Sequence, residues 1–251
     1  MKLLVLILAW LRSVVVTILF PITILILGPA AILGHYFLNK RQLDDYLVSL
    51  WGRLCCRMSG VTVVVEGRQN IPNEGCLFLF NHSSFFDVFA LAGYLRGTRF
   101  GAKAELFKIP IFSHTIKAMG TLPIARGNRE EVYKIYDEAK VRFTNGEKFA
   151  LSPEGGRFYG PQLAPFKAGP FVFAQSAGAP IVPVVVLGAY TALPKNSFLF
   201  NKNKLFHTIH LKILLPIDTK NFNTQNRKDL QQLVYDRMNT VWMAENKFTV
   251  F

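Results

Sequence analysis

The chain has 251 residues, a net charge of +13 and a hydrophobic content of 51%, with 22 phenylalanines. This length suits one well-buried domain with a small appendage, and the charge suits an anionic partner such as lipid headgroups or a phosphorylated substrate. The sequence has neither zinc-finger spacing nor the aromatic and basic signature of an RNA-recognition sheet, so we expect no nucleic-acid partner. Its three cysteines, Cys55, Cys56 and Cys76, include an adjacent pair and indicate reduced thiols rather than a disulfide framework.

Residues 3–38 form an apolar block that is interrupted by Arg12. A single helix over residues 13–38 would be roughly 39 Å long at about 1.5 Å per residue, which is enough to cross a bilayer. Pro21 and the Gly28-Pro29 pair predict breaks in such a helix, and the block is too short for two complete spans. We therefore expect an N-terminal membrane-associated helical hairpin, formed by two helices of this block partly immersed in one leaflet. A single span is the second interpretation, and a buried hairpin or a cleaved signal peptide is less favoured.

Basic residues flank the apolar block and favour a cytoplasmic position for the domain that follows. We thus expect a monotopic protein on the cytoplasmic face of a membrane, which is the inner membrane if the source is bacterial. The flanking basic residues are Lys2, Lys40, Arg41, Arg53 and Arg57.

Residues 42–59 have the pattern of an amphipathic helix, with Trp51 as a candidate interfacial anchor. Beyond them, strand-like runs alternate with helical patterns, which is typical of an α/β fold with a mostly parallel or mixed central sheet flanked by helices. We expect a membrane-associated segment over 1–60 and an α/β domain over 61–251. The predicted strands are 61–66, 76–80, 99–102, 121–125, 149–151, 181–187 and 209–215, and the predicted helices are 85–95, 105–119 with a break at Pro110, 128–144, 168–177 and 226–246.

The turn between the strand at 76–80 and the next helix holds a histidine and an aspartate five residues apart, His82 and Asp87. Asp87 lies in the predicted first turn of the helix, where side chains lean back toward the preceding strand end. A carboxylate placed on an imidazole fixes its tautomer and supports positive charge on the ring, as a general base requires. The alternative is a hydrogen-bonded core histidine beside a helix-start acid that the helix dipole favours.

Two further strand ends carry charged residues: Arg126, and the turn that contains Glu154 and Arg157. Ligands bind at the carboxyl ends of strands in such sheets, so we expect these turns to converge with His82 on one cleft. A histidine base with two arginines suits an acceptor that has both a hydroxyl and a phosphate. Taken alone, Arg126 is equally an exposed loop residue and the second turn an ordinary one.

Four blocks in this order resemble the glycerolipid acyltransferases of the lysophosphatidic acid acyltransferase type. The His-x4-Asp motif corresponds to His82 through Asp87, preceded by Asn81, and the resemblance extends over about residues 60–190. Gly156, Ser152 and Ala125 depart from the usual family residues, which bears on the acceptor more than on the reaction. The other three blocks are Gly-Thr-Leu-Pro-Ile-Ala-Arg at 120–126, Pro-Glu-Gly-Gly-Arg at 153–157 with its continuation at 163–169, and Ala-Pro-Ile-Val-Pro-Val at 179–184.

The resemblance implies transfer of a fatty acyl chain from acyl-CoA or acyl-carrier protein to the sn-2 hydroxyl of lysophosphatidic acid, which gives phosphatidic acid in phospholipid biosynthesis. It implies His82 and Asp87 as the catalytic pair, and backbone N–H groups at the helix start as candidates for the oxyanion site. No metal, no covalent acyl-enzyme and no cofactor beyond the co-substrate is expected. The implied substrate-binding residues are Glu154, Gly155, Arg157, Arg126, Lys103 and Asn81.

Three other functions stay open at this point. One is acylation of another lysophospholipid or of an amino-lipid. Another is non-catalytic binding of anionic membrane lipid through the basic region 155–217, which contains no acidic residue. The third is a hydrolytic metalloenzyme that uses His82, Asp87 and Glu154. The phenylalanine-rich segments around 78–89 and the stretch 105–119 are candidates for an acyl channel, although an ordinary core explains them equally well.

Overall fold

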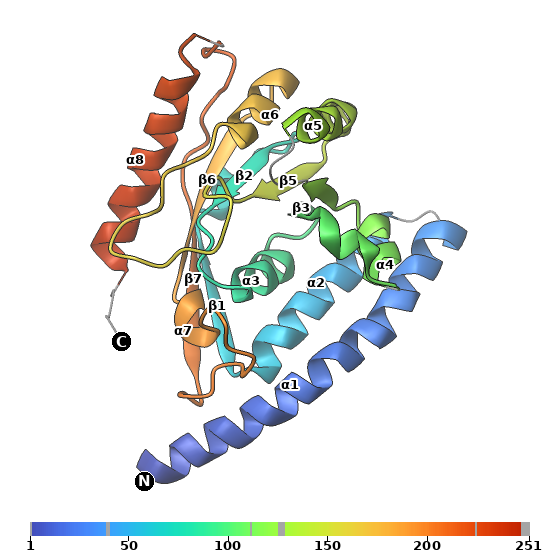
Figure 1. The fold of residues 1–251 in the computed structure, drawn as a ribbon, viewed down its shortest axis with the longest axis vertical. Coiled ribbons are helices and arrows are strands. Elements are labelled where there is room, and N and C mark those ends of the chain that lie inside the picture. Colours follow the sequence, from blue (N-terminus) through green and yellow to red (C-terminus); the bar gives the residue numbers. More distant parts are fainter. Residues whose placement is uncertain (1, 39–40, 111, 125–128, 224, 247–251) are drawn as a thin grey trace.

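The computed structural model describes residues 2–38, 41–110, 112–124, 129–223 and 225–246. Within these residues, a seven-stranded sheet carries helices on both faces (Figure 1). Its strands are β1 (Val61–Glu66), β2 (Leu77–Phe80), β3 (Thr98–Lys103), β4 (Leu122–Ile124), β5 (Lys148–Leu151), β6 (Ile181–Leu187) and β7 (His207–Ile213). The α-helices are α1 (Lys2–Leu33), α2 (Arg41–Met58), α3 (Phe86–Tyr94), α4 (Phe112–Ala118), α5 (Arg129–Thr144), α6 (Gly169–Ala177), α7 (Ala189–Ala192) and α8 (Arg227–Glu245).

The strand order is β1-β7-β6-β2-β5-β3-β4, and each neighbouring pair is parallel except β6 with β7. This mixed sheet, flanked by helices, confirms the predicted α/β fold. Strands β2, β5 and β3 are neighbours, so their C-terminal ends share one edge of the sheet, where ligands bind in open α/β sheets. The boundary at residue 60 falls in the turn between α2 and β1 and stays a prediction.

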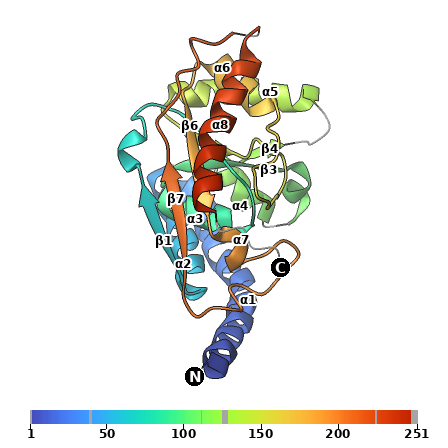
Figure 2. The same cartoon turned by 90° about the vertical axis from the view of Figure 1, so that its left-hand side faces the viewer.

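The sheet is buried on both faces at its centre, because β2 contributes side chains to two hydrophobic clusters. Phe78 and Phe80 join the cluster beneath α2 and α3, whereas Leu77 and Leu79 join the cluster beneath α5, α6 and α8. Figure 2 shows α8 lying along the second of these faces. An all-apolar strand of this kind is typical of a central position in a sheet that is covered on both sides.

The predicted break within residues 3–38 is wrong, since α1 continues through Pro21 and Pro29 as one helix. Both prolines are exposed, and the opposite side of α1, which includes Ala9, Val16 and Ala31, is buried. Each proline removes one ladder hydrogen bond, and packing along the buried side keeps the helix continuous. By length and composition alone, Lys2–Phe37 is long and apolar enough to cross a membrane.

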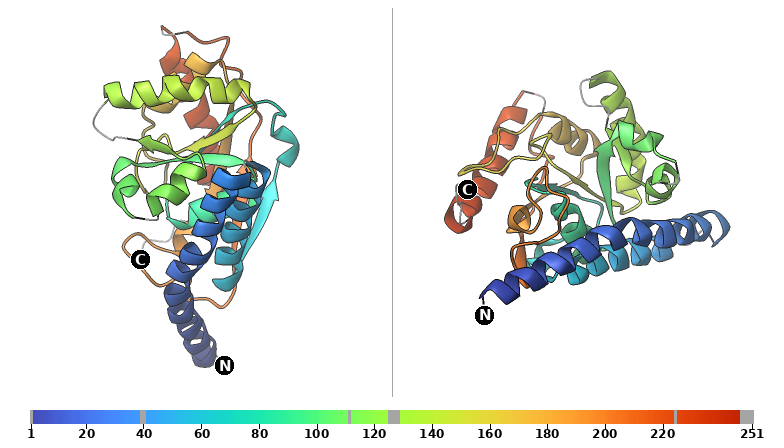
Figure 3. Two further views of the ribbon diagram at one scale, coloured as in Figure 1. Left: turned by 90° about the vertical axis from the view of Figure 1, so that its right-hand side faces the viewer. Right: turned by 60° about the horizontal axis from the view of Figure 1, so that its bottom comes forward.

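The N-terminal hairpin therefore consists of α1 and α2, which reverse at a π-helical turn over Gly34–Leu38. Figure 3 shows the two helices side by side along one end of the molecule. Trp51 of α2 faces inward rather than acting as an interfacial anchor, because its ring packs on Phe20 and Phe89 and its indole N–H donates to the Thr23 hydroxyl at 3.1 Å. The hairpin is thus packed on the domain from Ala9 onward, whereas residues 2–8 are exposed.

Candidate active site

The turn after β2 brings His82 and Asp87 into contact, as their spacing predicted. His82 Nδ1 lies 2.9 Å from Asp87 Oδ2, and the backbone N–H groups of Ser83 and Ser84 donate to the same oxygen at 2.8 and 2.9 Å. A carboxylate only accepts hydrogen bonds, so His82 Nδ1 carries the proton and Nε2 is left with a free lone pair. The Asp87 side chain is fully buried and that of His82 is 15% exposed. The pair therefore presents one basic nitrogen outward.

Ser84 holds the start of α3 in place through its hydroxyl group. The hydroxyl accepts from the N–H of Phe86 at 3.0 Å and donates to the carbonyl of Leu193 at 2.7 Å. Because Asp87 already takes the N–H groups of Ser83 and Ser84, these two groups are not available to an oxyanion. The expectation that backbone N–H groups at the helix start form the oxyanion site stays a prediction and now concerns the other N–H groups of this turn.

Asn81 is 1% exposed, and its amide bridges to β6. Its Nδ2 donates to the Val186 carbonyl at 3.0 Å, and its Oδ1 accepts from the Val186 N–H at 2.7 Å. Both ends of the amide are thus used to fasten the end of β2 to β6. The side chain holds the strand end from which His82 projects, and the assignment of Asn81 to substrate binding stays a prediction.

Glu154 is also buried and lies behind the histidine. One carboxylate oxygen accepts from the His82 N–H at 2.7 Å, and the other accepts from the Ala164 N–H at 3.1 Å. Burial raises the pKa of Glu154 to about 7, although the two N–H bonds act in the opposite direction and nearby Asp87 adds to the rise. Both oxygens thus already accept backbone donors, and the predicted role of Glu154 in holding the glycerol phosphate stays a prediction.

The Glu154 turn and the His82 turn are joined a second time, because the N–H of Phe158 donates to the His82 carbonyl at 2.8 Å. Both backbone groups of His82 are therefore fixed by the segment after β5. Gly155 has a φ of 71° in this turn, a left-handed conformation that favours glycine. The backbone of the third sequence block thus positions the histidine.

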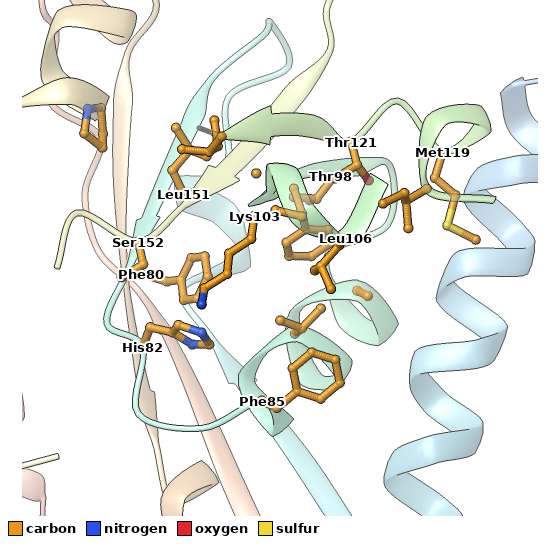
Figure 4. Close-up of a pocket in the computed structure, with 18 of the residues that line it drawn as sticks. Phe80, His82, Phe85, Thr98, Lys103, Leu106, Met119, Thr121, Leu151 and Ser152 are labelled. Carbon is orange, nitrogen blue, oxygen red and sulfur yellow. The ribbon is translucent and has the colours of Figure 1, made fainter. Parts of the chain in front are cut away.

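His82 opens onto a cavity of about 1300 Å³ at the C-terminal edge of the sheet. Figure 4 shows His82, Phe80 and Ser152 around one part of this cavity, with the amino group of Lys103 pointing toward His82. Among the described lining residues none is acidic. The basic ones are Lys103, Arg157, Lys167, Lys195 and Arg227.

The predicted substrate-binding residues divide into three groups. Lys103, Gly155 and Arg157 line the cavity with His82, whereas Asn81 and Glu154 lie outside its lining. Within the described part of the chain, Arg157 has no ion-pair partner, so its charge is available to a ligand. Arg126 lies outside the described residues.

Lys167 lines the cavity beside Gly155 and was given no role from the sequence. A Cβ on Gly155 would meet the end of the Lys167 side chain at 2.8 Å, so the lysine crosses directly over this glycine. In the sequence, the block at 163–169 contains Lys167 and could have indicated that this residue belongs to the site.

The remaining part of the cavity is apolar and is enclosed by the N-terminal hairpin, α3 and α4. The stretch 105–119 does line it, as does Phe85, in agreement with the channel interpretation. The contribution of α1 could not be foreseen, because that helix was expected to lie in a membrane rather than against the site. The apolar lining residues include Ile24, Leu27, Leu47, Val48, Trp51, Phe85, Val88, Leu106, Phe112, Ile116 and Met119.

In the described ranges, no cluster of three or more histidine, cysteine, aspartate or glutamate residues is arranged to hold a metal ion. Both carboxylate oxygens of Glu154 accept hydrogen bonds from backbone N–H groups. Glu154 therefore offers no free ligand atom to a metal ion beside the His82–Asp87 pair. The metallohydrolase interpretation therefore loses one of its three proposed ligands.

Residues 62–187 match the family model described as Acyltransferase. A chloroplastic 1-acyl-sn-glycerol-3-phosphate acyltransferase of Brassica napus is 25% identical over 74% of this chain and 56% of its own length, and a 1-acyl-sn-glycerol-3-phosphate acyltransferase of Saccharomyces cerevisiae is 29% identical over 72% and 60%. The chain thus spans about half the length of the plant relatives it matches. The crystal structure of a 1-acyl-sn-glycerophosphate acyltransferase, PlsC, from Thermotoga maritima has the same fold, with a TM-score of 0.75 at 24% identity over 96% of this chain and 100% of that one.

Proposed function

The chain belongs to the acyltransferase family, and on that premise we propose that it moves a fatty acyl chain from acyl-CoA or acyl-carrier protein to the sn-2 hydroxyl of lysophosphatidic acid. The product is phosphatidic acid, an intermediate of phospholipid biosynthesis. One observation carries the proposal: a His–Asp pair opens onto a cavity that is basic on one side and apolar on the other. This arrangement suits an acceptor that combines a hydroxyl, a phosphate and a hydrocarbon chain.

His82 acts as the general base in this proposal. Its Nε2 takes the proton of the acceptor hydroxyl as the oxygen attacks the thioester carbonyl, and Asp87 stabilises the imidazolium that forms. Collapse of the tetrahedral intermediate breaks the carbon–sulfur bond, and the imidazolium returns its proton to the thiolate. A positioned base of this kind contributes about 10²–10⁴-fold.

The phosphate of the acceptor binds to Lys103, Arg157 and Lys167. All three line the cavity with His82, and the described lining has no acidic residue to compete for them. Each charge-assisted hydrogen bond to the phosphate contributes about 1.5–3 kcal/mol. Arg126, at the end of the second sequence block, is proposed as a further contact on the basis of the family resemblance alone.

The acyl chain lies in the apolar part of the cavity, between the hairpin and α4. Residues of α1, such as Ile24 and Leu27, form part of this wall, so the apolar part of the cavity borders on this helix. We propose that α1 lies along one leaflet on the cytoplasmic side, half immersed. The buried residues of α1 run from Ala9 to Ala31, so a perpendicular span would draw the domain that packs on this stretch into the bilayer.

Acyl transfer by the full-length protein, purified in detergent, tests this function. Acceptors are lysophosphatidic acid, a neutral-headgroup lysolipid, an amino-lipid and glycerol 3-phosphate, each offered with acyl-CoA and with acyl-carrier protein. We expect phosphatidic acid from lysophosphatidic acid, and the same rate in the presence of EDTA. Transfer only to another acceptor would keep the reaction and change the substrate, and lipid binding without any transfer would refute the enzyme assignment.

A further inference from the structure

The strongest unexplained surface feature is a loop at residues 193–206, between α7 and β7, which we call the 193–206 loop. It carries Phe198 and Phe206, each with 82% of its surface exposed, the highest values among the large hydrophobic residues of the described chain. Single exposed apolar residues are common on protein surfaces, but two largely exposed phenylalanines in one loop indicate an interaction site.

The exposed rings belong to a loop that packs on the core of the domain. Phe200 is turned inward and packs on Phe20, Phe86 and Phe89, with ring centroids 5.4, 6.2 and 6.1 Å apart. The loop therefore supplies one phenylalanine to the core and presents Phe198 to the outside.

Two asparagines fix the path of the loop on either side of Phe198. Asn196 and Asn201 have φ values of 68° and 47°, the positive values that the described residues other than glycine show. Such conformations persist only when the surrounding structure enforces them. Asn201 is enforced in this way, because its N–H donates to the Ala192 carbonyl at 2.6 Å and its side-chain amide donates to the Ser59 carbonyl at 3.0 Å.

The loop is fastened to α1 by side chains of that helix. The Arg12 guanidinium donates to the carbonyl of Asn201 at 3.0 Å, to that of Lys204 at 2.7 Å, and to that of Leu205. The Thr17 hydroxyl lies 2.9 Å from both the Phe198 carbonyl and the Ser13 carbonyl of its own helix, and it can donate its one hydrogen to either. In Figure 3 the loop lies beside the N-terminal half of α1, and the contact with Thr17 places residue 198 next to this helix. This also explains why an arginine interrupts the apolar block.

The charge of the 193–206 loop indicates which kind of partner it binds. Lys195, Lys202 and Lys204 are exposed, and the sequence from 155 to 217 contains no acidic residue. Exposed phenylalanines among lysines suit a membrane surface, where the rings enter the acyl boundary and the ammonium groups stay with anionic headgroups.

We propose that the 193–206 loop is a second membrane-docking element, which inserts Phe198 and Phe206 into a leaflet that contains anionic phospholipid, beside the immersed face of α1. The proposal rests on the leaflet position proposed for α1. The loop reaches the catalytic turn at one end, through the bond from the Ser84 hydroxyl to Leu193, and Lys195 lines the cavity. Its insertion therefore holds the cavity opening at the level of the headgroups, where a lysolipid acceptor resides.

Site-specific labelling tests this insertion without reference to activity. Cys55, Cys56 and Cys76 are buried, and burial raises the pKa of the Cys55 and Cys76 thiols to about 12, so an introduced surface cysteine is the reactive one. Phe198→Cys and Phe206→Cys carry an environment-sensitive fluorophore on the full-length protein. The matched control is Val141→Cys, because Val141 is 65% exposed on α5, far from the N-terminal half of α1 in Figure 1.

The labelled proteins are mixed with vesicles of phosphatidylcholine, with and without phosphatidylglycerol. We expect a blue shift and quenching by lipid-borne spin labels at 198 and 206, stronger with phosphatidylglycerol, while the label at 141 is quenched only by aqueous iodide. Labels at 198 and 206 that behave like the label at 141 would overturn the proposal.

A second measurement separates docking from a purely structural role of the loop. The double variant Phe198→Ser/Phe206→Ser should bind these vesicles about tenfold more weakly for each ring removed. Its turnover of a short-chain acceptor dissolved as monomer should equal that of the wild type. Equal losses on dissolved and vesicle-borne acceptor, or unchanged vesicle binding, would contradict the proposal. If the wild type lacks acyltransferase activity altogether, the labelling result still decides whether the loop inserts.

Discussion

Replacing Asp87 by asparagine separates the charge of this side chain from its hydrogen bonding. The amide oxygen can take the place of Oδ2 and accept the same three N–H groups, from His82, Ser83 and Ser84. It cannot supply the negative charge that faces the imidazole when the ring takes a proton. Two unit charges about 4 Å apart attract each other by about 4 kcal/mol at an effective dielectric constant of about 20. We therefore expect kcat to fall by about 10³-fold, with KM for both substrates nearly unchanged.

The assay is steady-state release of the free thiol from acyl-CoA with lysophosphatidic acid, for the wild type and Asp87→Asn. Asp229→Asn is the matched control, since Asp229 is also an acid in the first turn of a helix but is exposed. Thermal unfolding in the same detergent checks that the variant is folded, because its amide nitrogen would occupy the position of Oδ1, a buried atom without a hydrogen-bond partner in the described structure. A loss of kcat smaller than about tenfold in a folded variant would refute the charge argument.

Three further predictions concern residues around this pair. Arg157→Ala and Lys167→Ala should each lower kcat/KM for lysophosphatidic acid by about 10–100-fold, mainly through KM, and leave any turnover of a neutral lysolipid unchanged. Burial raises the pKa of Glu154 to about 7 in the folded protein. The unfolding free energy of the wild type, relative to that of Glu154→Gln, should therefore fall by up to about 3 kcal/mol as the pH rises from about 4.5 to 7. A difference that stays constant over this pH range in chemical denaturation would contradict the assignment. Burial alone would raise the pKa of Glu147, but its bonds to Arg142 and Arg41 lower the pKa to about 2. The stability that the Glu147 carboxylate contributes to the fold should therefore be complete above pH about 4.5 and be lost as the pH falls toward 2. Glu147→Gln should lower the unfolding free energy by about 3 kcal/mol at neutral pH, and no loss in chemical denaturation would show that the ion pairs of Glu147 do not stabilise the fold.

The sequence was sufficient for features that depend on neighbouring residues. The alternation of strands and helices predicted the α/β sheet, and the five-residue spacing across a strand-to-helix turn predicted the contact between His82 and Asp87. Both follow from local geometry. The break at Pro110 was predicted for the same reason. The structure has a 3-10 helix at Ala104–Lys108 and the separate helix α4, which begins at Phe112.

Features set by long-range contacts could not be predicted in this way. Pro21 and Pro29 signal a broken helix, yet packing on the domain keeps α1 continuous. Glu154 and Arg157 are three residues apart in one turn, and nothing local decides which of them faces the ligand. The decision depends on the backbone N–H of His82, 72 positions earlier, which takes a Glu154 oxygen as its acceptor and so turns that carboxylate away from the cavity. The side chain of Asn81 is likewise held by a hydrogen bond to Val186 of β6, more than a hundred residues later.

The most direct test of the account is acyl transfer to lysophosphatidic acid by His82→Ala beside the wild type. His210→Ala is the matched control, because His210 pairs with Glu66 across β1 and β7, outside the lining of the cavity. We expect phosphatidic acid from the wild type and the control, and a loss of at least about 10²-fold in His82→Ala with its unfolding temperature nearly unchanged. Activity that survives in His82→Ala would show that the His82–Asp87 pair is structural and that the proposed mechanism is wrong.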